Sequence, residues 1–194
     1  MAAMEPYLTA RFGNPSSAHR WGQEASAALE GARARLASAI GARPSEVRFV
    51  RGGTESDNLA IIGGTRALAR EGGMPIILTS AIEHSAVLEP AEWLESRGEA
   101  ELHVLPVTPT GDLDLKSDVA DLENRPSLAS VMWANNETGV LLPVDEVVSW
   151  ARMSGTVVHT DASQAVGKVP IDLGDVGVDL LTATGPKLGG PRGC

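Results

Sequence analysis

The stretch that decides the fold runs from residue 76 to residue 106 and reads IILTSAIEHSAVLEPAEWLESRGEAELHVLP. It opens with a short apolar run, Ile76–Ser80, and continues with a helical pattern from about Ser85 to Arg97. Gly98 ends that helix, and a second apolar run, Glu101–Pro106, follows it. A strand, a helix and a strand in this order predict a right-handed crossover between two parallel strands.

The same alternation extends over the rest of the chain. Further apolar runs predict strands at Val47–Arg51, Leu128–Trp133, Thr156–Thr160 and Asp179–Ala183. Further helices are predicted at Ser17–Ile40, from Thr54 to just before Gly72-Gly73, at Leu115–Leu122 and at Val144–Met153. The sequence therefore predicts an α/β fold with a largely parallel sheet covered on both faces. Ligands of such sheets bind where strands run into helices, at the carboxyl ends of the strands.

The helix predicted at Ser17–Ile40 has the clearest pattern, because its apolar residues recur every three or four positions. Ser16 or Ser17 can cap its start. Gly41 can end it, and Pro44 prevents it from resuming.

Composition narrows the class of protein. The 194 residues are 43% hydrophobic and 21% charged, which suits one or two packed domains. A net charge of −9 argues against nucleic acid or an anionic membrane as the main partner. The one cysteine, Cys194, is the last residue, so neither a disulfide framework nor a cysteine-based zinc cluster is expected. The four histidines are scattered, and no metal site is expected.

The sequence also bears on targeting. No apolar run approaches the roughly 20 residues of a membrane span. The segment Met1–Tyr7 lacks the basic and apolar regions of a signal peptide. The expectation is a soluble cytoplasmic protein.

Two strand-to-helix loops in the first half of the chain carry residues suited to chemistry. Residues 51–58, RGGTESDN, place two glycines before a helix start, an arrangement that can hold a phosphate on free N–H groups. An ordinary glycine turn followed by a threonine cap explains the same residues. Glu83-His84 follows the strand Ile76–Ser80, where a histidine is usually a helix cap.

The second half has three such loops. Residues 133–139, WANNETG, form a good turn. Asp161 follows the apolar pair Val157-Val158 and suits either a cationic partner or a helix cap. Lys187 lies between glycines and prolines, and a lysine held in a rigid loop can form a Schiff base once its pKa is depressed. A solvated lysine is the ordinary alternative.

Taken in chain order, these segments resemble the fold-type I enzymes that depend on pyridoxal phosphate. The resemblance is to the class V aminotransferase branch with the cysteine desulfurases and selenocysteine lyases. It covers nearly the whole chain and implies one cofactor-binding large domain over residues 1–194, with a mostly parallel, seven-stranded type of sheet. The matching segments are FGNPSS (12–17), GTESDN (53–58), EH (83–84), NNETG (135–139), DASQAVGK (161–168) and KLGGPRG (187–193).

The resemblance implies pyridoxal 5′-phosphate (PLP) as the cofactor and assigns catalytic roles. Lys187 would hold PLP as a Schiff base and, once freed, move protons. His84 would stack on the PLP ring and assist proton transfer. Asp161 would pair with the pyridinium nitrogen and keep it protonated, so that the ring can withdraw electrons.

The resemblance also assigns binding roles. Thr54, with the Gly53 backbone, would hold the phosphate at the helix start, and Thr184 would add a hydroxyl. Gln164 and Asn136 would lie near the phenolic oxygen and the substrate side of the ring.

The reaction implied by the resemblance removes sulfur from L-cysteine to give L-alanine and a persulfide on an enzyme cysteine. The sulfur would pass to iron–sulfur scaffold or other acceptor proteins. A homodimer is implied, with the helix Ser17–Ile40 as a candidate interface element. Selenocysteine lyase or another class V aminotransferase stays open, because cysteine and selenocysteine differ by one atom.

Three departures from the family pattern stand out. Pro186 occupies the place of the family's usual histidine, which removes a phosphate donor and predicts weaker cofactor binding. The chain ends before the positions of the mobile catalytic cysteine and the arginine for the substrate carboxylate, and Cys194 does not match that cysteine. The start lacks the usual first strand and its Ala-Thr-Thr-Pro-like loop. The chain is therefore expected to hold most of the large domain without the small domain, and an inactive remnant that only binds or dimerises is the alternative.

Other enzyme classes fit less well. A dinucleotide-binding protein would need a G-x-G-x-x-G segment, and none is present. The segment that comes nearest to the phosphate-binding loop of nucleoside triphosphatases, G-x-x-x-x-G-K-[ST], is Ala162–Val169. It has alanine in place of the first glycine and valine in place of the final Ser or Thr. A serine hydrolase would need G-x-S-x-G, which is also missing.

Overall fold

The computed structural model describes residues 3–69, 73–115, 119 and 125–191. The chain forms two compact units, which are described separately. The first consists of Met1–Phe49 and Ile171–Asp175, and the second of Val50–Pro170 and Val176–Cys194.

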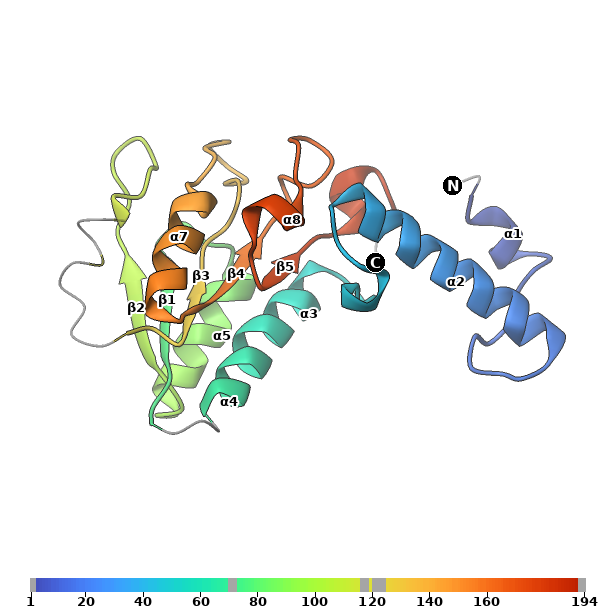
Figure 1. The fold of residues 1–194 in the computed structure, drawn as a ribbon, viewed down its shortest axis with the longest axis horizontal. Coiled ribbons are helices and arrows are strands. Elements are labelled where there is room, and N and C mark those ends of the chain that lie inside the picture. Colours follow the sequence, from blue (N-terminus) through green and yellow to red (C-terminus); the bar gives the residue numbers. More distant parts are fainter. Residues whose placement is uncertain (1–2, 70–72, 116–118, 120–124, 192–194) are drawn as a thin grey trace. The chain divides into compact units, whose positions relative to one another are not determined.

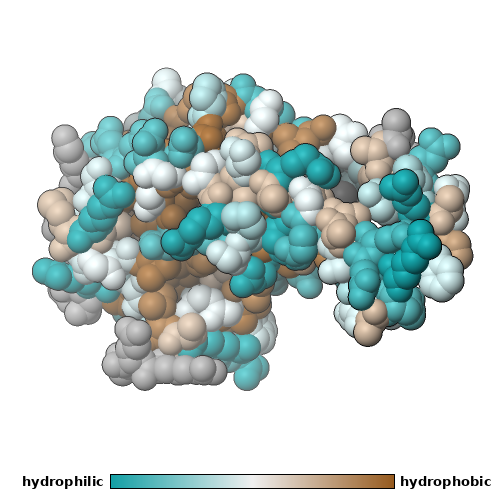
Figure 2. All heavy atoms as spheres, turned by 45° about the vertical axis from the view of Figure 1, so that its right-hand side comes forward, coloured by the Kyte–Doolittle hydropathy of each residue, from teal (hydrophilic) through white to brown (hydrophobic). Residues whose placement is uncertain are grey.

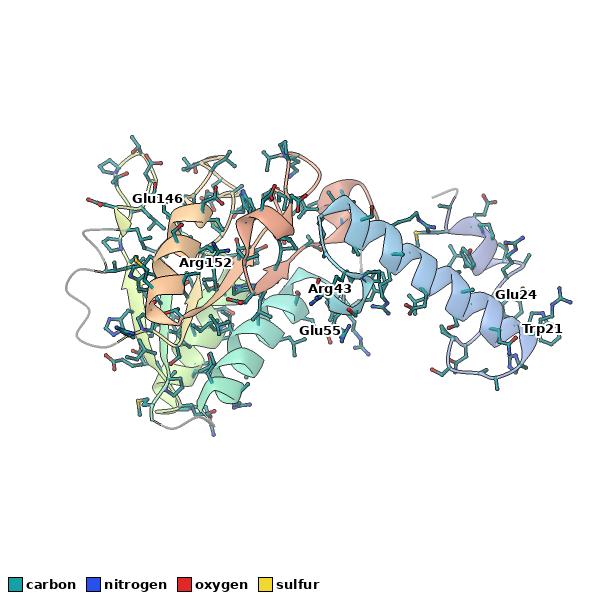
Figure 3. All side chains as sticks on the ribbon, in the orientation of Figure 1. Trp21, Glu24, Arg43, Glu55, Glu146 and Arg152 are labelled. Carbon is teal, nitrogen blue, oxygen red and sulfur yellow. The ribbon has the colours of Figure 1, made fainter. Side chains whose placement is uncertain are left out.

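The first unit is helical. It holds α1 (Glu5–Leu8), α2 (Arg20–Ala39), the short 3-10 helix η1 (Pro44–Glu46) and the start of α8 (Leu173–Val176). Figure 3 labels Trp21 in the first turn of α2, where its side chain is largely exposed.

The long helix ends where the sequence predicts but begins later. Gly41 follows its C-cap, Ile40, with a positive φ of 69°, which confirms the predicted stop. The predicted serine cap is wrong, because His19 is the N-cap and its Nδ1 accepts a hydrogen bond from Gly22 N. Ser16 and Ser17 instead donate their N–H groups to Asn14, which forms a separate turn before the helix.

The strand predicted at Val47–Arg51 is also wrong. Val47 has extended backbone angles, but no strand of the described residues pairs with this segment. The Val47 carbonyl instead accepts a hydrogen bond from Arg33 Nη1 at 2.6 Å. An apolar run adopts strand geometry without becoming a strand when no neighbouring strand is available to it.

The second unit contains a five-stranded parallel sheet in the order β2-β1-β3-β4-β5 (Figure 1). Its strands are β1 (Ile76–Ser80), β2 (Glu101–Leu105), β3 (Leu128–Ser130), β4 (Val157–Asp161) and β5 (Leu180–Thr182). All four neighbouring pairs are parallel. The predicted parallel α/β architecture is confirmed, and each of the other five predicted strands is present within a few residues of its expected ends.

Helices precede, connect and follow these strands. A continuous helical segment comprises α3 (Gly53–Asn58), the π-helical turn η2 (Leu59–Gly63) and α4 (Gly64–Leu68), as Figure 1 shows. The other helices are α5 (Ser85–Ser96), α7 (Val144–Ser154) and the 3-10 helix η4 (Gly185–Leu188). The helices predicted from Thr54, Ser85 and Val144 are therefore confirmed. The one predicted at Leu115–Leu122 lies mostly outside the described residues.

The sheet separates two apolar clusters. Ile77 belongs to a cluster with Val87 and Leu94 of α5 and Ile61 of η2. Its neighbour Leu78 belongs to the other cluster, which includes Val147 of α7. Successive strand residues point to opposite faces, so α5 with η2 covers one face and α7 the other. The sheet is thus held between two layers of helices, and its carboxyl edge is fixed in position.

The surface is mixed in character. Figure 2 shows hydrophilic side chains over much of one face, with hydrophobic patches between them. Within the described part of the chain, no helix combines the length and apolarity that crossing a membrane requires.

Candidate active site

Polar residues gather at the carboxyl edge of the sheet. Glu83 and His84 follow β1, Asn135 and Asn136 follow β3, and Asp161 is the last residue of β4. Because the strands are parallel, these positions lie along one edge, which is where sheets of this kind bind ligands. All the candidate residues named from the sequence belong to the second unit.

The start of α3 offers a place for an anion. Gly52 precedes it with φ 155° and ψ 178°, a backbone region that essentially only glycine adopts. Gly53 is the first helical residue, and Thr54 follows it. The first N–H groups of a helix have no partner within the helix, so they are available to bind a ligand.

Hydroxyl side chains from other segments surround this helix start. A Cβ atom built on Gly53 would lie 3.5 Å from Ser163 Oγ and 3.5 Å from Thr184 Cβ. Gly53, Thr184 and Ser163 therefore meet, although more than 100 residues separate the first from the other two. Ser163 was not among the predicted site residues. The sequence feature that could have pointed to Ser163 is its position two residues after Asp161, in the same loop.

Glu55 completes the local structure of α3. Its Oε2 accepts a hydrogen bond from Arg51 N at 2.6 Å, so the side chain reaches back over the first turn. Because Arg51 precedes the N-cap Gly52, this hydrogen bond spans the Gly52-Gly53 turn. Figure 3 labels Glu55 beside the start of the helix.

Asp161 presents a fixed carboxylate. The residue is only 6% exposed, and its Oδ1 accepts a hydrogen bond from Ser163 N at 2.9 Å. Its backbone is paired in register with Thr182 of β5. A buried carboxylate held in this way suits a cationic N–H group of a ligand.

His84 is the N-cap of α5, the role that a histidine after a strand usually has. Its Nδ1 accepts a hydrogen bond from Ala86 N at 3.1 Å, so a neutral ring carries its proton on Nε2. The ring itself is exposed. His84 and Thr54 line the same cavity of about 440 Å³, which continues along α3 and α5 to Ile62 and Trp93.

Two further acids lie buried close to Asp161. Asp57 is 1% exposed, and burial, with the charge of Asp161 as a second cause, raises its pKa to about 7. Burial likewise raises the pKa of Glu83 to about 8. Glu83 is therefore mostly protonated at pH 7, and Asp57 is about half protonated. Sequence reasoning missed this role of both residues.

The two asparagines differ sharply. Asn136, the predicted ligand, is exposed. Asn135 is buried, and its Oδ1 accepts hydrogen bonds from Glu137 N and Thr138 N. Gln164 accepts a hydrogen bond from Lys168 Nζ, four residues further along the chain in a turn.

Lys187 lies in η4 with its side chain exposed. Its N–H donates to the carbonyl of Thr184 at 3.3 Å, which ties the lysine to the residue beside Gly53. Pro186 occupies the first turn of η4. A proline fits there without strain, because its missing N–H has no partner in a first turn.

Comparison with known families identifies the chain. The model of the family called aminotransferase class-V matches residues 1–194. The chain belongs to the class-V aminotransferases. This family is PLP-dependent.

The most similar curated relatives of this class-V aminotransferase are cysteine desulfurases. The chain is 43% identical to the cysteine desulfurase of Gluconacetobacter diazotrophicus over 194 residues, all of this chain and 48% of that protein. It is 43% identical to the cysteine desulfurase NifS of Azotobacter vinelandii over 98% of this chain and 47% of that one. The chain thus spans about half the length of the curated relatives it matches.

Solved structures agree. A structure titled "SspA in complex with cysteine" superposes with a TM-score of 0.91 at 33% identity, over 99% of this chain and 55% of that one. DndA from Streptomyces lividans gives a TM-score of 0.86 at 40% identity, over 99% and 53%. The fold of this class-V aminotransferase is therefore that of the cysteine desulfurases, over the half that the chain spans.

Proposed function

We propose that this chain binds PLP at the carboxyl edge of its sheet and provides the cofactor-binding part of a cysteine desulfurase. The observation that carries the proposal is the meeting of Gly53, Ser163 and Thr184 at the start of α3. The N–H groups of a helix start, beside a glycine and the side chains of Ser163 and Thr184, suit a phosphate because no Cβ blocks its approach. Asp161, two residues before Ser163, suits the ring nitrogen of the same cofactor.

PLP would supply a protonated ring that withdraws electrons from the substrate carbon attached to it. The side chains of this protein would do the rest. Asp161 Oδ2 would accept the ring N–H and keep it protonated, while Oδ1 stays bonded to Ser163 N. Lys187 Nζ would attach the cofactor covalently and, once released, carry a proton to or from the substrate.

His84 would stack on the cofactor ring at the start of α5. Its exposed Nε2 would then exchange a proton with the substrate, since Nδ1 is held by Ala86 N. Asn136 and Gln164 would face the substrate side, and the Gln164–Lys168 hydrogen bond would have to open for this. Thr54 and Thr184 would hold the phosphate.

The proposed substrate is L-cysteine, converted to L-alanine with the sulfur left as a persulfide on an enzyme cysteine. The names of the relatives and the cysteine-bound structure support this choice over selenocysteine. Cys194 lies outside the described residues. Iron–sulfur scaffold or other sulfur-acceptor proteins would take the sulfur.

A second copy of the chain is the proposed structural partner. Several large apolar side chains of the first unit are exposed, among them Leu8, Phe12 and Trp21. Exposed apolar surface of this kind is typical of interfaces. Sedimentation analysis of the purified chain would test the proposed homodimer, and a monomer at all concentrations would contradict it.

The experiment that tests cofactor binding uses the purified chain and added PLP. The expected result is a visible absorbance band of lysine-bound cofactor that Lys187→Ala abolishes. Borohydride reduction followed by peptide mass analysis should place the cofactor on Lys187. A folded chain without such a band would overturn the proposal and favour a piece that only binds partners.

A further inference from the structure

The loop between β1 and α5 is tied to the end of β3 by two side chains. Glu83 Oε1 accepts a hydrogen bond from Met132 N at 2.7 Å. From the other side, Asn135 Nδ2 donates to the carbonyl of Ile82 at 3.0 Å. Residues 82 and 83 are therefore held to the segment after β3 by hydrogen bonds from both directions.

Glu83 also binds its own strand. Its Oε1 accepts the hydroxyl of Ser80, the last residue of β1, at 2.6 Å. The side chain is 93% buried, since the residue is 7% exposed. One carboxyl oxygen thus joins the ends of two neighbouring strands at the residue immediately before His84.

We propose that Glu83 is a positioning residue, which joins the ends of β1 and β3 and thereby fixes His84 at the start of α5. This inference rests on the role of His84 in the proposed function. Among the described residues, the one hydrogen bond of the exposed His84 ring is that of Nδ1 with Ala86 N. The peptide that precedes it must therefore be held from elsewhere, and Glu83 holds it.

The bonds around Glu83 require an acceptor but no charge. Both known donors, Ser80 Oγ and Met132 N, point to Oε1, while Oε2 is buried without a hydrogen-bond partner among the described residues. A neutral acid satisfies this arrangement, and the raised pKa of about 8 agrees with it. The groups that face Glu83 are Asp161 of β4 and Asp57 of α3, so an added charge would be repelled by a carboxylate.

Glutamine is therefore the matched replacement. Glu83→Gln keeps the oxygen that accepts both hydrogen bonds and matches the neutral acid in shape. Glu83→Ala removes the acceptor and leaves Met132 N buried without its partner, which is unfavourable. Glu92→Ala, an exposed position on α5, serves as the control.

The test reads His84 directly in the apo chain. The ring nitrogen signals of His84 in ¹⁵N NMR spectra report which nitrogen carries the proton and how firmly the ring is held. At pH 7 we expect Glu83→Gln and Glu92→Ala to match the wild type. Glu83→Ala should shift and broaden these signals while the circular dichroism of the fold is retained. In PLP titrations, Glu83→Ala should bind at least ten-fold more weakly.

A second arm raises the pH. Ser80 Oγ and Met132 N can donate to an ionised Glu83 as well as to a neutral acid, so the wild type should keep its pH 7 signals up to pH 9, as Glu83→Gln should. Loss of these signals in the wild type alone would contradict an acceptor role that needs no charge, even if Glu83→Ala does not fold. Unchanged His84 signals in Glu83→Ala would overturn the inference, as would Glu83→Gln behaving like Glu83→Ala at pH 7. If no variant binds PLP, the proposed function fails, while the spectra of the apo chain still test Glu83.

Discussion

His159 Nε2 lies 3.7 Å from Asp57 Oδ1, and both side chains are almost completely buried. This is too long for a hydrogen bond. The ring nitrogens bond instead to hydroxyls, Nδ1 to Ser130 Oγ at 2.8 Å and Nε2 to Thr182 Oγ1 at 3.1 Å. Burial lowers the pKa of His159 to about 4, just as it raises that of Asp57. His159 is therefore uncharged near neutral pH, whereas Asp57 is about half protonated at pH 7.

Asp57→Asn should change the pH dependence of stability. The folded pKa of about 7 lies above the unfolded value of about 4, so the folded chain holds a proton that the unfolded chain releases. The contribution of Asp57 to the free energy of unfolding therefore falls as the pH rises from about 4 to about 7. The difference between Asp57→Asn and the wild type should grow in favour of the variant by roughly 2–3 kcal/mol from pH 5 to pH 8. Urea unfolding at the two pH values measures it, and parallel curves would refute the assignment.

His159→Gln should act at the acid end. The pKa of His159 in the folded chain, about 4, lies below its ordinary value of 6.5. Between these pH values the unfolded chain therefore binds a proton at His159 that the folded chain does not bind. The contribution of His159 to the free energy of unfolding should fall as the pH falls from about 6.5 to about 4, by up to about 1.4 kcal/mol per pH unit. Glutamine does not titrate, and that contribution should vanish. Thermal unfolding between pH 7 and pH 4 would show the two slopes, and equal slopes would contradict the prediction.

Alanine substitutions at the neighbouring Gly52 and Gly53 should have different effects, the first on stability and the second on PLP binding. Gly52→Ala puts a Cβ on a backbone with φ 155° and should lower the free energy of unfolding by roughly 1–3 kcal/mol. Gly53→Ala meets its nearest neighbours at an ordinary 3.5 Å and should leave stability nearly unchanged. Its methyl group would, however, occupy the proposed phosphate position and weaken PLP binding at least ten-fold. Urea unfolding and PLP titration of both variants separate the two effects. Normal PLP binding by Gly53→Ala would exclude the proposed phosphate position at Gly53.

Ser163→Ala tests the hydroxyl that the sequence did not single out. Loss of one hydrogen bond to a charged phosphate costs roughly 1.5–3 kcal/mol, so PLP affinity should fall by about ten-fold or more. The stability of the apo chain should hardly change. Ser149→Ala on α7, where the hydroxyl bonds only its own helix, is the control. Equal PLP affinity of Ser163→Ala and the control would remove Ser163 from the site.

The sequence predicts the parallel sheet because strand and helix patterns are local, and each loop at the carboxyl edge follows from them. It fails where distant segments decide the outcome. Val47–Arg51 has a strand's composition, but no strand lies beside it. Ser163 becomes important only through its approach to Gly53, and Thr182 Oγ1 bonds Ser56 Oγ across 126 positions. No single-sequence pattern reveals that Asp57, in a polar helix start, points into the interior.

Pro186→His tests the departure from the family's usual histidine. The structure accepts Pro186 in the first turn of η4, so the proline is no obstacle to folding. It does lack an N–H, and its ring cannot donate to a phosphate. Pro186→His should therefore tighten PLP binding by about ten-fold, the usual size of one hydrogen bond to a charged group. Pro186→Ala restores the backbone N–H alone and should increase PLP affinity less than Pro186→His does. The comparison separates the contribution of the backbone N–H from that of the imidazole. Titration of the visible band measures all three chains. Equal affinities would mean that the start of α3 and the hydroxyls of Ser163 and Thr184 hold the phosphate without help from position 186.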